Sequence, residues 1–130
     1  MRTSVIEVVR TLWRVDRKLR REGFDATRQA FARDASTRLW DTRGIDALAR
    51  EVHRFGRFWP GSACLHQALA LASLIRRNGI DCELVLGAER NHGVVMAHAW
   101  IECDGRALDE SGERLAKLAI LARFPFEGVQ

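Results

Sequence analysis

The sequence predicts an α+β protein, with helices first and a small antiparallel sheet after them. In the N-terminal half, apolar residues recur at spacings of three and four, as they do along amphipathic helices. In the C-terminal half, apolar runs end at turn signals, and Asp104-Gly105 strongly favours a two-residue hairpin. We therefore expect N-terminal helices, followed by one further helix packed on a small sheet.

The chain has 130 residues, which fits a single domain with a helical part at about 1–58 and a core at about 59–121. Its apolar fraction of 47% and charged fraction of 29% are typical of a soluble globular protein. No apolar run is long enough to cross a bilayer, and the N-terminus has no signal-peptide core. With an odd number of cysteines, three, we expect free thiols and a cytoplasmic location.

The formal net charge is +4, and arginine makes most of the excess. The densest basic group lies in the predicted first helix and comprises Arg14, Arg17, Lys18, Arg20 and Arg21. Helical spacing spreads these side chains around a polar side, which favours a solvated face over a surface for an acidic partner. Nucleic acid is the weakest alternative, because the chain carries no zinc finger and no aromatic ribonucleoprotein motif.

The helical part begins with an amphipathic helix whose apolar positions include Val5, Val8, Leu12 and Leu19, and Gly23 is its expected C-cap. A shorter helix is expected over 26–32, a connection over 34–41, and a further helix from near Gly44. The segment 56–61 contains Phe58, Trp59 and Pro60 and is interpreted as a loop whose aromatic side chains pack back onto the core.

The next predicted helix has Cys64 in its first turn. Ser62 is a suitable N-cap, and leucine and alanine dominate the run 64–75. Arg76 and Arg77 would lie in the last turn, with Gly79 just past the end. Strands are then expected over 82–86, 94–103 and 106–109, with a polar loop over 89–93 and a final helix over 113–121 that caps the sheet.

The best candidate for chemistry is a cysteine and histidine pair. A Cys64 thiol at a helix N-terminus faces the positive end of the helix dipole, which favours the nucleophilic thiolate. His98, on a neighbouring strand, could complete the pair, and a carboxylate could orient its imidazole. This pattern indicates a cysteine hydrolase.

The choice of carboxylate follows from strand register. If Asp104 and Gly105 form a two-residue loop, Trp100 lies opposite Asp109, which then shares a face with His98. A three-residue loop would instead bring Glu110 to that face, because a one-residue slip turns every side chain over. We therefore expect Asp109 beside His98.

The motifs resemble those of the transglutaminase-like cysteine hydrolases, which implies a transglutaminase-like or papain-like core. Within this superfamily, the motifs resemble those of the standalone leader peptidases of lasso-peptide biosynthesis. The residues that carry this resemblance are Cys64-Leu65-His66-Gln67-Ala68-Leu69-Ala70-Leu71, Leu74-Ile75-Arg76-Arg77-Asn78-Gly79-Ile80 and Ala97-His98-Ala99-Trp100-Ile101-Glu102-Cys103-Asp104-Gly105. One departure is Gln67, which stands where that family often has arginine.

The resemblance implies a catalytic triad of Cys64, His98 and Asp109, with no cofactor and no metal. It implies removal of the leader from a ribosomally made lasso-peptide precursor. The expected partners are that precursor, a separate leader-recognition protein of the kind called a RiPP recognition element, and an ATP-dependent lasso cyclase. Two other functions stay open: a non-catalytic peptide-binding module and a transglutaminase-type acyl transferase.

Other residues have simpler interpretations. Cys82 and Cys103 fall outside the predicted site face and are expected to be core thiols. Trp100 lies on that face, where it could line the cleft and contact substrate, although core packing is the more common role. His66 and His92 could join a metal site with Cys64, but their spacing matches no common zinc arrangement.

Overall fold

The computed structural model describes residues 5–32, 43–57 and 64–127. Its helices are α1 (Val5–Glu22), α2 (Phe24–Ala32), α3 (Arg43–Gly56), α4 (Cys64–Arg77) and α5 (Gly112–Ala116). Its strands are β1 (Cys82–Asn91), β2 (Val94–Cys103), β3 (Arg106–Ala107) and β4 (Ala119–Phe126). The helices and the antiparallel sheet confirm the α+β prediction.

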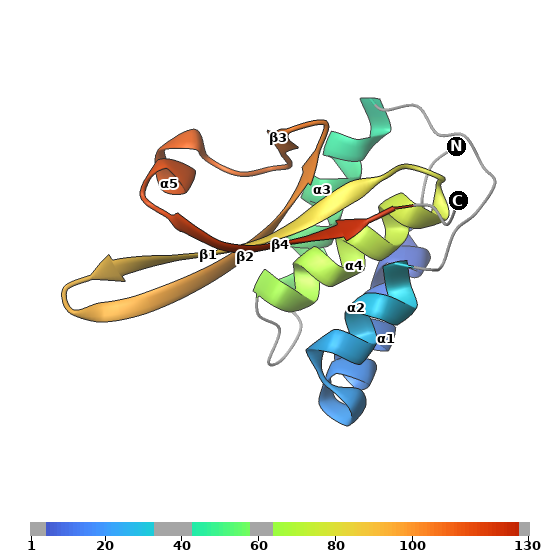
Figure 1. Ribbon diagram of the computed structural model, residues 1–130. Coiled ribbons are helices and arrows are strands. Elements are labelled where there is room, and N and C mark those ends of the chain that lie inside the picture. Colours follow the sequence, from blue (N-terminus) through green and yellow to red (C-terminus); the bar gives the residue numbers. More distant parts are fainter. Residues whose placement is uncertain (1–4, 33–42, 58–63, 128–130) are drawn as a thin grey trace.

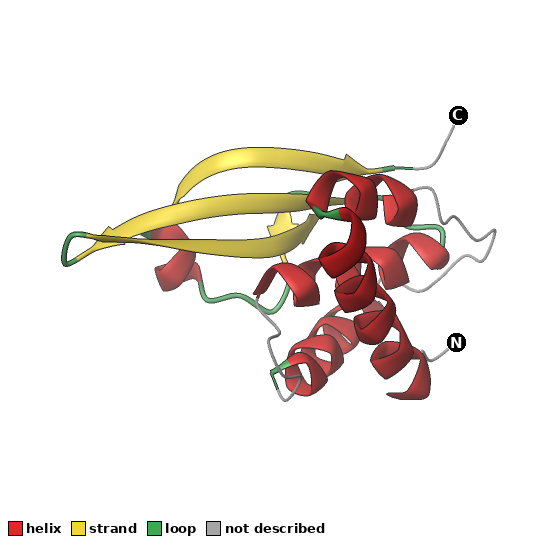
Figure 2. Ribbon diagram, turned by 90° about the horizontal axis from the view of Figure 1, so that it is seen from below, coloured by secondary structure: helices red, strands yellow, loops and turns green. Residues whose placement is uncertain are grey.

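Helix α4 lies at the centre of the molecule. It packs against α1, α2 and α3 and also contacts β1 and β2 (Figures 1 and 2). Its residues from Ala68 to Ile75 are buried, which agrees with its run of leucine and alanine. Burial of these apolar side chains fixes the helix and therefore its N-terminal residue, Cys64.

The sheet has the strand order β3-β2-β1-β4, and all its pairs are antiparallel. Figure 1 shows α4 on one side of the sheet and α5 on the other. The side toward α4 carries Leu84 and Ile101, which are fully buried in the core. The β1–β2 hairpin extends beyond the helices, as both ribbon views show.

Both hairpins of the sheet turn through two residues. Asp104 and Gly105 have φ of 52° and 74°, and His92 and Gly93 have φ of 51° and 80°. Positive φ at both loop positions is the type I′ geometry, which matches the right-handed twist of paired strands. Because Cys103 pairs with Arg106, the predicted register of the second hairpin is confirmed.

The helix and strand bounds confirm much of the prediction. α1 ends before Gly23, whose φ is 85°, and α4 ends before Gly79, whose φ is 77°. β2 has the predicted bounds. The predicted connection over 34–41, the side chains of Phe58, Trp59 and Pro60, and the Ser62 N-cap lie outside the described residues.

Three predictions about the C-terminal half were wrong. The expected strand over 106–109 ends at Ala107. The expected loop over 89–93 is largely strand, because β1 continues to Asn91 before the turn. The expected helix over 113–121 stops at Ala116, and Leu121 lies in β4. Pairing of β4 with β1 outweighs the helical leucine spacing, since cross-strand contacts override local preference. In the described part of the chain, none of the helices is both long and apolar enough to cross a membrane.

Candidate active site

Cys64 is the first residue of α4 and is half-buried. The pKa of its thiol is lowered, chiefly by a hydrogen bond with His98, although burial opposes this effect. Backbone N–H groups of Ala99 and Leu65 also lower the pKa by hydrogen bonding to the sulfur. The N-terminus of α4 and the edge of β2 together favour a thiolate at this position.

His98 lies on β2 and links two side chains. Its Nε2 is 2.9 Å from Oε1 of Glu110. The pKa of His98 is raised to about 9 by the hydrogen bond with Cys64 first and by the Glu110 hydrogen bond next, against the effect of burial. A lowered cysteine pKa beside a raised histidine pKa favours a thiolate and imidazolium pair at neutral pH.

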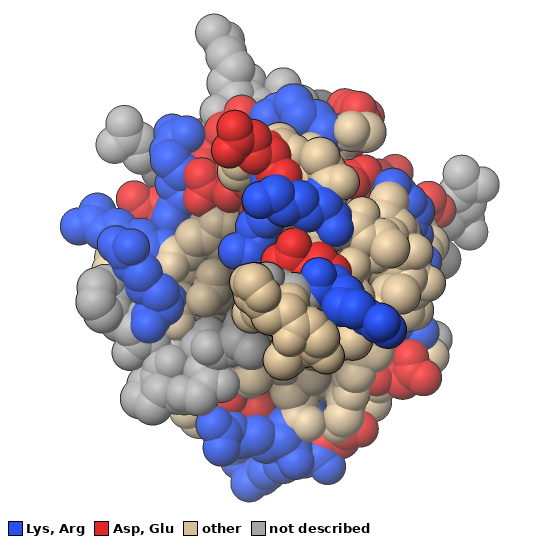
Figure 3. All heavy atoms as spheres, turned by 90° about the vertical axis from the view of Figure 1, so that its left-hand side faces the viewer, with Lys and Arg blue, Asp and Glu red and all other residues tan. Residues whose placement is uncertain are grey.

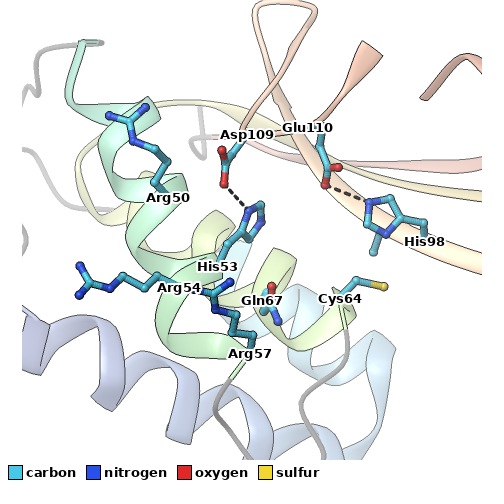
Figure 4. Close-up of a pocket in the computed structure, with 10 residues that line it drawn as sticks. Arg50, His53, Arg54, Arg57, Cys64, Gln67, His98, Asp109 and Glu110 are labelled. Carbon is cyan, nitrogen blue, oxygen red and sulfur yellow. Dashed lines mark hydrogen bonds and ion pairs between the residues drawn. The ribbon is translucent and has the colours of Figure 1, made fainter. Parts of the chain in front are cut away.

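The structure does not bring Asp109 to His98. Oδ2 of Asp109 is 2.8 Å from Nδ1 of His53, a residue of α3 (Figure 4). The hairpin has the expected two-residue loop, yet the expected side-chain alternation fails after β3. Leu108 still donates its N–H to Ile101, but Asp109 has a φ of 51°, which is left-handed rather than extended.

This backbone change decides which carboxylate faces the histidine. Strand alternation continues only while the backbone stays extended, so the reversal at Asp109 turns the next side chain toward β2. Glu110 then approaches His98 and is almost fully buried there, with a side-chain exposure of 9%. The structure thus brings together Cys64, His98 and Glu110. Asp109 forms a separate pair with His53.

The site opens into a cavity of about 570 Å³. Among the residues that the structure describes, ten line it: Arg50, His53, Arg54, Arg57, Cys64, Gln67, His98, Ala99, Asp109 and Glu110. Four of these, Arg50, His53, Arg54 and Arg57, come from α3 or the residue that follows it. The cavity therefore lies between α3, the start of α4 and the segment after β3, as Figure 4 shows.

Sequence reasoning missed the contribution of α3 to this cavity. His53 and the three arginines lie on an amphipathic helix, where polar residues are ordinarily solvated. Gln67, which stands where the lasso leader peptidases often have arginine, lies one turn after Cys64 and lines the cavity. A Cβ on Gly56 would come within 2.5 Å of Cγ of Gln67, so the absence of a side chain leaves room for this glutamine. Helical spacing indicates which face of α3 is polar, but it does not indicate that this face lines a cavity.

Trp100 packs against His98 and is not among the residues that line the cavity. It is 3% exposed, and its ring stacks on His98 with the centroids 5.8 Å apart. Its indole Nε1 donates to Glu102 at 2.9 Å. Trp100 therefore has the core-packing role, the more common of the two considered for it, and its ring stacks on the imidazole of His98.

Gly87 provides the space that Trp100 occupies. It lies opposite His98 in the β1–β2 register, and a Cβ there would lie 2.8 Å from Cη2 of Trp100 and 3.3 Å from the backbone oxygen of Ala119. We expect Gly87→Ala to lower the free energy of unfolding by about 1–3 kcal/mol through overpacking and to lower the reactivity of Cys64. Denaturant unfolding and alkylation rates measure both effects.

Gly112→Ala is the matched control, since a Cβ at that glycine meets nothing within 4 Å. An unchanged stability and reactivity in Gly87→Ala would show that Trp100 does not hold His98 in place.

The remaining cysteines and histidines lie apart from this site. Cys82 and Cys103 are buried and hydrogen-bond each other across β1 and β2, as expected for core thiols. His66 interacts with Asp16 of α1 at 3.0 Å, and His92 lies in the hairpin turn. Among the described residues, no cluster of histidine, cysteine and carboxylate groups could hold a metal ion.

A pH prediction follows from the two pKa shifts at the Cys64–His98 pair. We expect Cys64 to react with iodoacetamide at lower pH than an ordinary thiol, because its pKa is lowered by the hydrogen bond with His98, which stays protonated up to about pH 9. His98→Gln should raise the pKa of Cys64 toward the ordinary cysteine value of about 8.5. Alkylation rates measured against pH would reveal the shift; an identical profile in the variant would refute the ion pair.

The comparison with family models decides the family. The model described as the transglutaminase-like superfamily matches residues 8–123. The chain belongs to the transglutaminase-like superfamily. This superfamily includes cysteine proteases and acyltransferases. The comparisons with curated proteins and with solved structures found no significant match.

Proposed function

We propose that this transglutaminase-like protein is a cysteine peptidase that removes the leader from a lasso-peptide precursor. The observation that carries the peptidase activity is the contact of Cys64 with His98, whose other partner is Glu110. The narrower assignment to leader removal rests on the resemblance of the motifs around Cys64 and His98 to the lasso leader peptidases.

The proposed reaction begins with the Cys64 thiolate. Its sulfur attacks the scissile carbonyl carbon, and protonated His98 donates a proton to the leaving amine, which departs as the C–N bond breaks. The leader then remains on Cys64 as a thioester. Neutral His98 accepts a proton from an attacking water, the C–S bond breaks, and the leader leaves as a carboxylate.

Glu110 is the proposed orienting carboxylate in this reaction. Its bond to Nε2 fixes the imidazole and leaves the second ring nitrogen for the thiolate. Asp109, which the motif resemblance assigned to this role, is bound instead to His53. We propose that this second pair is a positioning contact that ties the segment after β3 to α3.

Backbone groups at the start of α4 would stabilise the oxyanion. The first N–H groups of a helix have no acceptor within the helix, and that of Leu65 already points at the sulfur. If an amine rather than water resolved the thioester, the same residues would perform acyl transfer. Products weighed by mass spectrometry separate the two, because hydrolysis adds one water and transfer adds the amine.

Exposed apolar side chains offer a surface for the proposed recognition partner. Val94 and Met96 lie on the same face of β2 as His98, and Ile120 of β4 joins that face because it pairs with Gly87, which lies opposite His98; each is at least 48% exposed. Monomeric proteins rarely leave large apolar patches uncovered. β2 also carries His98, so a partner seated here would hold the precursor near the site.

We expect slow cleavage of a lasso precursor by this protein alone and faster cleavage with a leader-recognition protein. A partner that binds both the leader and the peptidase raises their effective concentration by about 10²–10⁴-fold. Steady-state kinetics with purified components would measure kcat/KM in both cases. Equal values of kcat/KM with and without the partner would refute the proposed role of the recognition protein but not the peptidase chemistry.

A further inference from the structure

The α3 side of the catalytic cavity is strongly basic. Arg50, Arg54 and Arg57 all line the cavity and are all exposed. Their spacing of four and three residues places them on one face of a helix. Figure 4 shows them following one another along α3, with Arg50 and Arg54 extending to the side away from Cys64. Basic side chains form several groups on the face of the molecule that Figure 3 shows.

The carboxylates of the cavity do not pair with Arg50 or Arg54. Asp109 is bound to His53 and Glu110 to His98. Within the described residues, Arg50 and Arg54 have no carboxylate partner, and the guanidinium group of Arg54 lies over the ring of Phe55.

Arg50 and Arg54 differ from exposed arginines elsewhere, such as Arg10 and Arg21 of α1, in that they line the cavity. The arginines of β3 and β4, Arg106 and Arg123, each bind acidic side chains. Arg50 and Arg54 lie one helical turn apart at the rim of the cavity that holds Cys64, and two guanidinium groups without a carboxylate partner can bind an anion there. Guanidinium groups bind carboxylates with two parallel hydrogen bonds, which makes a substrate carboxylate the best-fitting group.

We propose that Arg50 and Arg54 bind an acidic side chain of the peptide substrate, at a residue displaced from the scissile bond toward α3. The proposal rests on the peptidase function proposed above and adds the substrate class. The acidic residue would dock at the rim while its neighbours extend along the cavity to Cys64. Substrates with aspartate or glutamate there would be preferred over those with asparagine or glutamine.

The test uses the alkylation of Cys64 by a charged and a neutral reagent, iodoacetate and iodoacetamide, with glutathione as the reference for intrinsic reactivity. Peptide mass mapping restricts the readout to Cys64. We expect the iodoacetate-to-iodoacetamide rate ratio to fall about three- to tenfold in Arg50→Gln/Arg54→Gln, and to fall in wild type with added salt. Arg10→Gln/Arg21→Gln, on exposed positions of α1, removes the same charge outside the cavity and should keep the ratio.

A second arm identifies the kind of carboxylate. N-acetylaspartate amide, N-acetylasparagine amide and N-acetylalanine are compared at matched ionic strength as protectants of Cys64 against iodoacetamide. We expect the aspartate compound to protect best, and the double variant of Arg50 and Arg54 to lose this advantage. Protection by N-acetylalanine alone would show that a C-terminal carboxylate binds, and would overturn the proposal.

The outcomes separate this inference from the proposed function. If Cys64 reacts no faster than glutathione with iodoacetamide at pH 7, the thiolate nucleophile fails, whatever the arginines do. If Cys64 is reactive but the rate ratio is the same in wild type and in Arg50→Gln/Arg54→Gln, the peptidase chemistry stands and the acidic-substrate proposal is overturned.

Discussion

Replacing Cys64 with alanine is expected to reduce cleavage of the precursor by about 10⁴-fold or more while the protein remains folded. The reaction proposed here forms its only covalent bond to this sulfur, so removing the sulfur leaves no nucleophile. Because Cys64 is half-buried at the N-terminus of α4, its replacement by alanine removes few packing contacts. Precursor cleavage followed by mass spectrometry gives the rate, and circular dichroism gives the fold.

Cys103→Ala is the matched control, because Cys103 is a buried thiol in contact with Cys82 and outside the cavity. It should lower stability through a small core void but keep the chemistry. Cleavage that persists in Cys64→Ala would end the thiol-peptidase account.

Glu110→Gln is expected to slow cleavage by about 10²–10⁴-fold. The amide keeps the size of the side chain but removes the charge that helps raise the pKa of His98 to about 9. The folded pKa of His98 should therefore fall, and the alkaline limb of the pH–rate profile should move to lower pH. Profiles of kcat/KM against pH measure both the loss and the shift.

Asp109→Asn is the informative comparison, because Asp109 is the neighbouring carboxylate and is bound to His53. Asparagine accepts a hydrogen bond and tolerates the left-handed φ of 51°, so we expect a loss of less than about tenfold and no shift of the alkaline limb. A larger effect in Asp109→Asn than in Glu110→Gln would return the orienting role to Asp109.

Local signals in the sequence were sufficient to predict the helix and the hairpin that carry Cys64 and His98. The uninterrupted run after Cys64 predicted α4, and Asp104-Gly105 predicted both the hairpin and its register. These features depend on neighbours in the chain, such as helix formers without glycine and turn residues that favour positive φ.

The features that sequence reasoning missed depend on contacts between distant segments. The position of Glu110 follows from the left-handed backbone at Asp109, which is bound to His53 on α3. A register argument assumes an extended strand, and nothing in the local residues marks where the extension ends. The C-terminal strand β4 was missed for a similar reason. Its leucines have helical spacing, and only the pairing of β4 with β1 outweighs that local preference.

The most direct measurement of the central claim is the mass of the protein during turnover. An acid quench of the protein with a lasso precursor and its recognition protein should trap the thioester, which is stable in acid. We predict a mass increase equal to the leader minus one water, located on the peptide that contains Cys64 and absent in Cys64→Ala. Cleavage that proceeds while no acyl group is found on Cys64, at quench times that resolve a single turnover, would contradict the account.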